Sequence, residues 1–124
     1  MTSNTVFVTG AAGFIGHHVV RLLRAAGRPV RALVRPGEDL QNLDPQRGAG
    51  LELVEGDILD RGGLHEAMRG CSVVYHLAAL YRTWVPDTRV IYDVNVTGTA
   101  NVLAAATALG VRRLALGAAL LLVG

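Results

Sequence analysis

The residues best suited to chemistry form one glycine-rich turn, Thr9-Gly10-Ala11-Ala12-Gly13-Phe14-Ile15-Gly16. The turn follows a short apolar run at residues 6–8 and opens a segment with helical periodicity, the context in which helix-start amides bind a dinucleotide pyrophosphate. Gly10 would let the chain turn sharply, Gly13 would let amides approach the phosphates, and Gly16 would let the helix pack closely on the sheet. The pattern therefore favours dinucleotide binding over a purely structural turn. The expected contact residues here are Gly10, Ala12, Gly13, Phe14, Ile15 and Gly16.

The end of the second strand-like run, at residues 30–34, bears on which dinucleotide binds. An acidic residue about 20 positions beyond the glycine motif usually holds the ribose 2'-hydroxyl of NAD, whereas an arginine holds the 2'-phosphate of NADP. Position 35 is Arg35, Arg31 is close by in sequence, and the next acidic residue is Glu38. We therefore expect NADP as the cofactor, with NAD as the alternative. Arg35 could also be a solvated strand-end residue, because all 12 basic residues of the chain are arginines.

Strand-like and helix-like runs alternate along the chain, which indicates βαβ units around a parallel sheet. Strands are expected at residues 6–8, 30–34, 51–54, 73–77 and 111–116, with helices after residue 14, at 61–69 and at 87–109. The first helix is expected to bury one face made of Ile15, Val19, Leu22, Leu23 and Ala26. The predicted fold class is α/β, a Rossmann-type doubly wound parallel sheet with five strands in the order 3-2-1-4-5.

Composition and charge restrict the class of protein further. The chain has 124 residues, of which 51% are hydrophobic and 18% charged, so we expect one globular domain, residues 1–124, rather than disorder. The net charge of +2, with scattered arginines, argues against a nucleic-acid partner. Cys71 is the single cysteine and the first residues lack signal-peptide features, so a cytoplasmic location is expected. The longest apolar run, residues 114–123, is about half of the ~20 residues that a membrane helix needs.

Three further motifs follow the glycine-rich turn in order. They are Gly56-Asp57-Ile58 with Asp60, then Tyr75-His76-Leu77-Ala78-Ala79, and then Asn95-Val96 with Gly98-Thr99 and Asn101-Val102-Leu103. With these motifs the sequence, from residue 6 to about residue 113, resembles the extended short-chain dehydrogenase/reductases of the NAD-dependent epimerase/dehydratase type. Residues 81–87 are also similar to hopanoid-associated sugar epimerases and dihydroflavonol-reductase-like enzymes.

The resemblance implies a role for several residues beyond the glycine-rich turn. Asp57 would accept a hydrogen bond from the adenine amino group, with Ile58 packed beside the ring. The backbone of Leu77, Ala78 and Ala79 would line the ribose and pyrophosphate, and Asn95 would support the active site from the long helix. A small-molecule substrate would complete the reaction, and a homodimer is possible because relatives often pair through this helix.

Other residues with reactive side chains have plainer interpretations. His76 stands at a strand end, so we expect it to be packed or to support the site rather than to act as an acid or base. Cys71 is expected in the core, and no metal site is expected. Tyr81 and Trp84 lie in a stretch that either borders the substrate or covers the core.

Catalysis in this family depends on a serine or threonine after the fifth strand and on a tyrosine followed four positions later by lysine. The chain has Gly117-Ala118-Ala119 where the family usually has Thr-Ser-Ser, and it contains no lysine. Two hypotheses follow. The chain is the truncated N-terminal part of an NAD(P)-dependent epimerase/dehydratase or reductase, inactive alone and without its substrate domain, or it is a complete non-catalytic dinucleotide-binding module. We favour the first, because residues 114–124 depart abruptly from the family pattern, and we expect this apolar run to promote aggregation.

Overall fold

The computed structural model describes residues 4–48, 50–78, 89 and 93–116 of the chain. Five parallel strands form one sheet in the order β3-β2-β1-β4-β5. Their bounds are β1 (Val6–Thr9), β2 (Val30–Val34), β3 (Leu51–Glu55), β4 (Val73–His76) and β5 (Arg113–Leu116). Both the Rossmann-type fold class and the predicted strand order are confirmed.

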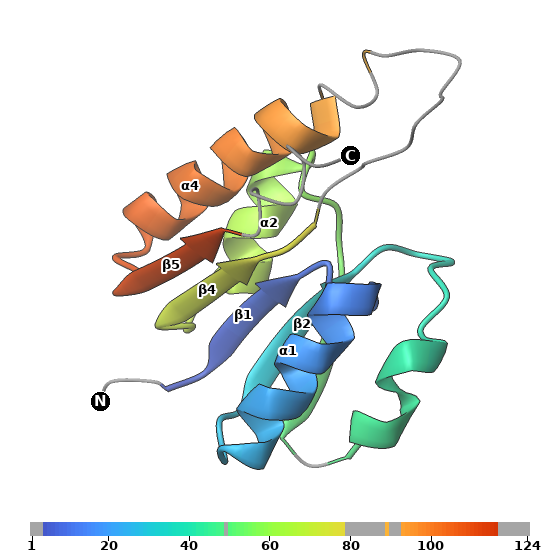
Figure 1. Ribbon diagram of the computed structural model, residues 1–124. Helices are drawn as coiled ribbons and strands as arrows, with labels where there is room; N and C mark the ends of the chain where they lie inside the picture. The colour runs from blue at the N-terminus through green and yellow to red at the C-terminus, as the bar shows by residue number, and fades with distance from the viewer. Residues whose placement is uncertain (1–3, 49, 79–88, 90–92, 117–124) are drawn as a thin grey trace.

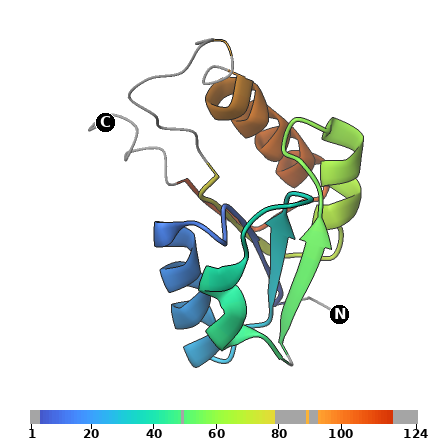
Figure 2. The same cartoon turned by 90° about the vertical axis from the view of Figure 1, so that its right-hand side faces the viewer.

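Helices cover both faces of this sheet. The α-helix α1 (Phe14–Ala25) and the 3-10 helix η1 (Gln41–Gln46) lie on one face, whereas α2 (Arg61–Met68) and α4 (Gly98–Ala108) lie on the other (Figure 1, Figure 2). A π-helical turn, η2 (Asp93–Thr97), leads directly into α4. Because both faces are covered, the central strands β2, β1 and β4 consist mainly of apolar residues on both faces.

Successive residues of β1 point into two separate cores. Val8 belongs to a buried cluster with Val20 of α1, whereas Phe7 belongs to a second cluster with Met68 of α2 and Val102 of α4. Val8, Val20, Phe7, Met68 and Val102 are all fully buried. The two cores pack the helices against the two faces of the sheet. This packing holds the strand ends, and the loops that follow them, in place.

The buried face of α1 differs from the prediction by about one residue. Gly16, Val20 and Leu23 are buried, whereas Ile15 is 39% and Leu22 62% exposed. Gly16 determines this rotation, because a Cβ atom at that position would collide with the carbonyl oxygen of Gly10. Residues four and seven positions after Gly16 therefore face the sheet. Of the other expected residues, Val19 is partly buried against the core and Ala26 is exposed.

The long helix predicted for residues 87–109 is less regular than expected over its described part. The π turn at residues 93–97 precedes an α-helix that begins at Gly98, and residues 90–92 lie outside the described part. Its expected apolar face is confirmed at Gly98, Val102 and Ala105, which are buried. A Cβ atom at Gly98 would collide with the side chain of Ile58, so the glycine permits the close approach of α4 to the loop after β3.

Strand β5 is an edge strand, as expected. It pairs only with β4 among the described strands, and Leu116 at its end is 46% exposed. Of the apolar run at residues 114–123, only residues 114–116 lie in the described part. Among the described residues, no helix is long and apolar enough to cross a bilayer.

Candidate dinucleotide-binding site

The loops that follow β1, β2, β3 and β4 all leave from the same edge of the sheet, because the strands are parallel. From β1 the chain moves outward to β2 and then to β3, whereas β4 and β5 lie on the other side of β1. The switch point of the fold therefore lies between the carboxyl ends of β1 and β4. Open α/β sheets bind ligands at such a point.

Gly10 lies close against the backbone of the segment after β4 at the switch point. Its φ of 69° lies in the left-handed region, which favours glycine. A Cβ atom there would also lie 2.6 Å from the backbone nitrogen of Ala78, in the segment after β4. Any larger residue would therefore push the loop after β1 away from the loop after β4.

The glycine-rich turn presents backbone N–H groups at the start of α1. Gly13 is the N-cap residue, its own N–H donates to the carbonyl of Gly10 over 3.1 Å, and its carbonyl accepts from the N–H of His17 over 3.0 Å. The N–H groups of the first helical turn have no carbonyl one turn earlier to bind. Gly13, Phe14 and Ile15 are exposed, and no acidic residue occurs in this turn. The arrangement suits an anion such as a pyrophosphate.

Asn42 is a site residue that the sequence analysis missed. It lies on η1, and its side-chain amide donates a 2.9 Å hydrogen bond to the carbonyl oxygen of Ala12. Ala12 itself is buried. The bond fixes the middle of the glycine-rich turn from outside α1. No local pattern could have revealed it, because the two residues are 30 positions apart in sequence.

Arg35 stands at the end of β2, where its exposed side chain makes no hydrogen bond or ion pair with any described residue. Its backbone N–H donates to a carboxylate oxygen of Glu38 over 3.0 Å, and the N–H of Glu38 donates back to the carbonyl of Arg35 over 3.0 Å. Glu38, the next acidic residue along the sequence, therefore contacts the strand end itself. The turn brings Glu38 back to the strand end, so an acid and an unpaired cation stand side by side.

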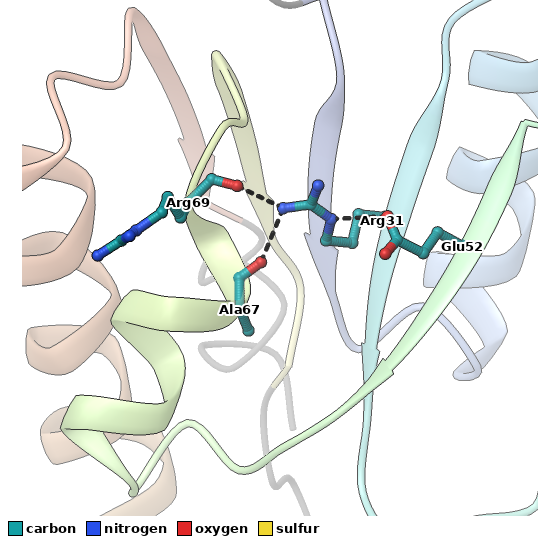
Figure 3. A network of polar contacts seen from close by, with 4 residues as sticks. All are labelled: Arg31, Glu52, Ala67 and Arg69. Carbon is teal, nitrogen blue, oxygen red and sulfur yellow. Dashed lines mark hydrogen bonds and ion pairs between the residues drawn. The ribbon is translucent and has the colours of Figure 1, made fainter.

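Arg31 does not contribute to this strand end. Its guanidinium donates to Glu52 on β3 over 2.9 Å and to the carbonyl oxygens of Ala67 and Arg69 over 3.0 and 2.6 Å (Figure 3). These carbonyls belong to the end of α2, where a cation is favoured by the helix dipole. Arg31 thus joins two strands to a helix, so its nearness to Arg35 in the sequence does not place its guanidinium at the end of β2.

Asp57 and Ile58 form a tight turn after β3. One carboxylate oxygen of Asp57 accepts from the N–H of Leu59 over 2.9 Å, which leaves the other oxygen able to accept from a ligand. The carbonyl oxygen of Ile58 accepts a 2.9 Å hydrogen bond from the side-chain amide of Asn101 on α4. Asn101 was part of a motif noted in the sequence, but its contact with this turn was not predicted.

The backbone after β4 is turned toward β1. The N–H groups of Leu77 and Ala78 donate to the hydroxyl oxygen of Thr9 over 3.1 and 3.0 Å. These two amides are therefore not available to a ligand, and only carbonyl oxygens and side chains remain for it. Ala79, Tyr81 and Trp84, for which roles were expected, lie outside the described residues.

His76 is buried at the end of β4, as expected for a packed residue. Its Nδ1 lies 2.6 Å from the hydroxyl oxygen of Thr9, and its Nε2 lies 2.9 Å from that of Thr99 on α4. Burial lowers the pKa of His76 to about 4, so the imidazole is neutral at neutral pH. Asn95, which the resemblance places near the active site, lies in the π turn before α4 and is half-buried.

Cys71 and the histidines of α1 do not add a second reactive centre. Cys71 is buried in the core, as expected, and burial raises the pKa of its thiol. The rings of His17 and His18 lie against one another in a tilted arrangement, and each meets the ring of Phe14 edge to face at the start of α1. No group of three or more potential metal ligands occurs among the described residues.

The fold and the motifs agree with one family of proteins. Residues 6–120 match the family model described as the NAD dependent epimerase/dehydratase family. The chain belongs to this family. It is 44% identical over 110 residues to a putative dihydroflavonol 4-reductase of Synechocystis, a match that covers 86% of this chain and 30% of that protein.

Solved structures of other members show the same fold. A short-chain dehydrogenase/reductase superfamily protein of Agrobacterium tumefaciens with bound NAD is 41% identical, with a TM-score of 0.71 over 90% of this chain and 31% of that one. The UDP-glucose 4-epimerase of Thermus thermophilus in complex with NAD is 33% identical, with a TM-score of 0.76 over 89% and 36%. The chain spans about three tenths of the length of the first curated relatives it matches.

Proposed function

We propose that this chain is the NAD(P)-binding part of an NAD(P)-dependent epimerase/dehydratase or reductase that acts on a sugar or carbonyl substrate. The observation that carries the proposal is the meeting of four strand ends at one edge of the sheet. The relevant loops follow β1, β2, β3 and β4 and contain the glycine-rich turn, Arg35, Asp57 and Leu77–Ala78. The solved relatives that contain NAD support a nicotinamide dinucleotide as the ligand.

The described residues fit such a ligand. The backbone amides of Phe14 and Ile15, both exposed residues, and of Gly16 behind them would hold the pyrophosphate, and Gly10 leaves room that a Cβ atom would fill. The second carboxylate oxygen of Asp57 would accept from the adenine amino group, with Ile58 beside the ring. The carbonyl oxygens after β4 would accept from ribose hydroxyls. When bound, the cofactor supplies a nicotinamide ring that takes up or releases a hydride.

We propose NADP as the preferred form, with NAD as the alternative, because the side chain of Arg35 has no described partner and could pair with a 2'-phosphate. Arg35→Asp should reverse the preference and weaken NADPH binding about tenfold or more, since a charge-assisted contact is replaced by repulsion. Arg112→Asp is the matched control, because Arg112 is also exposed but precedes β5 at the opposite edge of the sheet. Equal affinities of the parent for NADPH and NADH would contradict the preference.

Dinucleotide binding itself is tested by titrating the purified chain with NADPH and NADH in a calorimeter. Gly13→Asp places a carboxylate beside the helix start and should weaken binding of both by at least about tenfold. Gly62→Asp is the control, since a Cβ atom at Gly62 would meet no atom within 4 Å and the residue lies on α2. If the parent binds neither dinucleotide, or if both variants behave alike, the proposal fails.

We further propose that these 124 residues do not turn over substrate by themselves, whether the chain acts within a longer enzyme or as a binding module. The chain has no lysine, and Ala119 stands where the family usually has serine. Loss of a positioned acid or base alone removes about 10²- to 10⁴-fold in rate. A cytoplasmic location is part of the same proposal, supported by the single cysteine, which is buried. Cofactor-dependent turnover by the parent that Gly13→Asp abolishes would refute the proposed inactivity.

A further inference from the structure

Thr9 and His76 are the only polar residues that are buried in the described part of the chain, and they lie against each other at the switch point. Thr9 is fully buried at the end of β1, and His76 is 4% exposed at the end of β4. A buried polar pair is costly unless each donor and acceptor is satisfied. Whether Thr9 and His76 stabilise the switch point therefore depends on the partners of their donors and acceptors.

The hydroxyl of Thr9 has one hydrogen to donate and two lone pairs to accept with. The N–H of Ala78 donates to the hydroxyl oxygen over 3.0 Å, and the N–H of Leu77 is shared between this oxygen, at 3.1 Å, and the backbone carbonyl oxygen of Thr9, at 3.2 Å. Two N–H groups directed at this oxygen favour donation of its hydroxyl hydrogen to Nδ1 of His76, 2.6 Å away. Nδ1 accepts that hydrogen, so the neutral imidazole carries its own hydrogen on Nε2.

The Nε2–H group of His76 then donates to the hydroxyl oxygen of Thr99 over 2.9 Å. Thr99 is the second residue of α4, so the chain of hydrogen bonds runs from β1 through β4 to the start of a helix. The hydrogen bonds therefore run in one order: Thr9 donates to His76, and His76 donates to Thr99. A protonated imidazole would break this order, because its Nδ1–H would compete with the N–H groups of Leu77 and Ala78 for the lone pairs of the Thr9 hydroxyl.

The same turn of α4 also contacts the turn after β3, on the other side of the proposed site. Asn101 donates to the carbonyl oxygen of Ile58, and Gly98 lets the side chain of Ile58 pack directly on the helix. Within four residues, α4 thus contacts the loop after β3 and the end of β4. These are the two places at which the adenine and the ribose are proposed to bind.

We propose that His76 is a positioning residue for the dinucleotide, and that its Nε2–H tautomer, oriented by Thr9, fixes α4 to the switch point through Thr99. This inference rests on the proposed function and adds a residue that acts without touching the ligand. Without the contact to Thr99, α4 and the Ile58 turn attached to it would be free to shift relative to the end of β4. The distance between the turn after β3 and the end of β4 would then vary, and the dinucleotide would bind more weakly.

The test compares Thr99→Val with Thr99→Ser in the full 124-residue chain. Valine keeps the shape of threonine but removes the acceptor, so NADPH should bind at least about fivefold more weakly. Serine keeps the hydroxyl and should restore the parent dissociation constant to within about twofold. Thr107→Val is the matched control, since the hydroxyl of Thr107 donates to the carbonyl oxygen of Leu103 within its own helix. Val102→Ala controls for a general loss of packing under α4.

A second measurement is independent of the ligand. The ¹⁵N shifts of the His76 ring at neutral pH should show the Nε2–H tautomer in the parent and in Thr99→Ser, and the Nε2–H signal should exchange faster with water in Thr99→Val. An Nδ1–H tautomer in the parent would overturn the inference. So would Thr99→Val binding NADPH as tightly as the parent, or Val102→Ala losing as much affinity at equal stability. If the parent binds neither NADPH nor NADH, the proposed function fails together with the inference, whereas failure of the variants alone refutes only the inference.

Discussion

A carboxylate oxygen of Glu38 accepts a 3.0 Å hydrogen bond from the backbone N–H of Arg35 at the end of β2. Glu38 is partly buried, whereas the side chain of Arg35 is exposed and has no described partner. An acid therefore stands beside the cation that is proposed to hold the 2'-phosphate. The negative charge would oppose that phosphate, whereas it would favour a 2'-hydroxyl, which can donate a hydrogen bond to it.

Glu38→Gln should increase the preference for NADPH over NADH. Glutamine keeps an oxygen that can accept from the N–H of Arg35, so the turn is preserved while the charge is removed. Because the site is open to solvent, we expect a change of about two- to fivefold in the ratio of the two dissociation constants. Glu66→Gln, on the exposed surface of α2, is the control. A ratio that falls, or that changes equally in both variants, would contradict the role of Glu38.

The hydrogen bond from Asn42 to Ala12 should affect dinucleotide binding through the shape of the glycine-rich turn. Asn42→Ala removes one neutral hydrogen bond, which is worth about 1 kcal/mol, so NADPH should bind roughly two- to tenfold more weakly. Asn42→Asp should weaken binding further, because its carboxylate would face the Ala12 carbonyl near the pyrophosphate. Gln41→Ala changes the neighbouring exposed amide of η1 and should bind like the parent. Calorimetry checks all three variants, and unchanged binding by Asn42→Asp would refute the role.

The contacts of Glu38 and Asn42 could not be predicted from the sequence, whereas other parts of the fold and site could. The strands and the glycine-rich turn were predictable, because alternation of elements and glycine spacing are local patterns that the fold preserves. The rotation of α1 was missed, since it depends on the contact of Gly16 with Gly10 rather than on the apolar residues of the helix. Asn42 and Thr99 were not predicted as partners, because Asn42 binds a residue 30 positions away and Thr99 one 23 positions away.

Arg31 should stabilise the fold without affecting the dinucleotide. Arg31→Met removes the hydrogen bonds to Glu52 and to the carbonyl oxygens of Ala67 and Arg69, and we expect the free energy of unfolding to fall by about 1 to 3 kcal/mol. Glu52→Gln removes only the charge of an exposed partner and should cost less than about 1 kcal/mol. Urea denaturation measures both changes. A loss of NADPH affinity in Arg31→Met at equal fraction folded would show that Arg31 also serves the site.

The neutral state of His76 should make stability depend on pH. Its pKa is about 4 in the folded chain, lowered by burial from the ordinary value of 6.5. Between these two values the unfolded chain holds a proton that the folded chain does not, so stability is complete above about pH 6.5 and falls as the pH drops toward 4. The full shift corresponds to at most about 3 kcal/mol.

Urea denaturation at several pH values between 4 and 7.5 should therefore show a steeper loss of stability for the parent than for His76→Gln, whose side chain does not titrate. Because the carboxylates and the other histidines are present in both chains, their contributions cancel in the comparison. Parallel profiles would mean that His76 takes up its proton as readily in the folded chain as in the unfolded one, and the hydrogen-bond order from Thr9 to Thr99 would then be wrong.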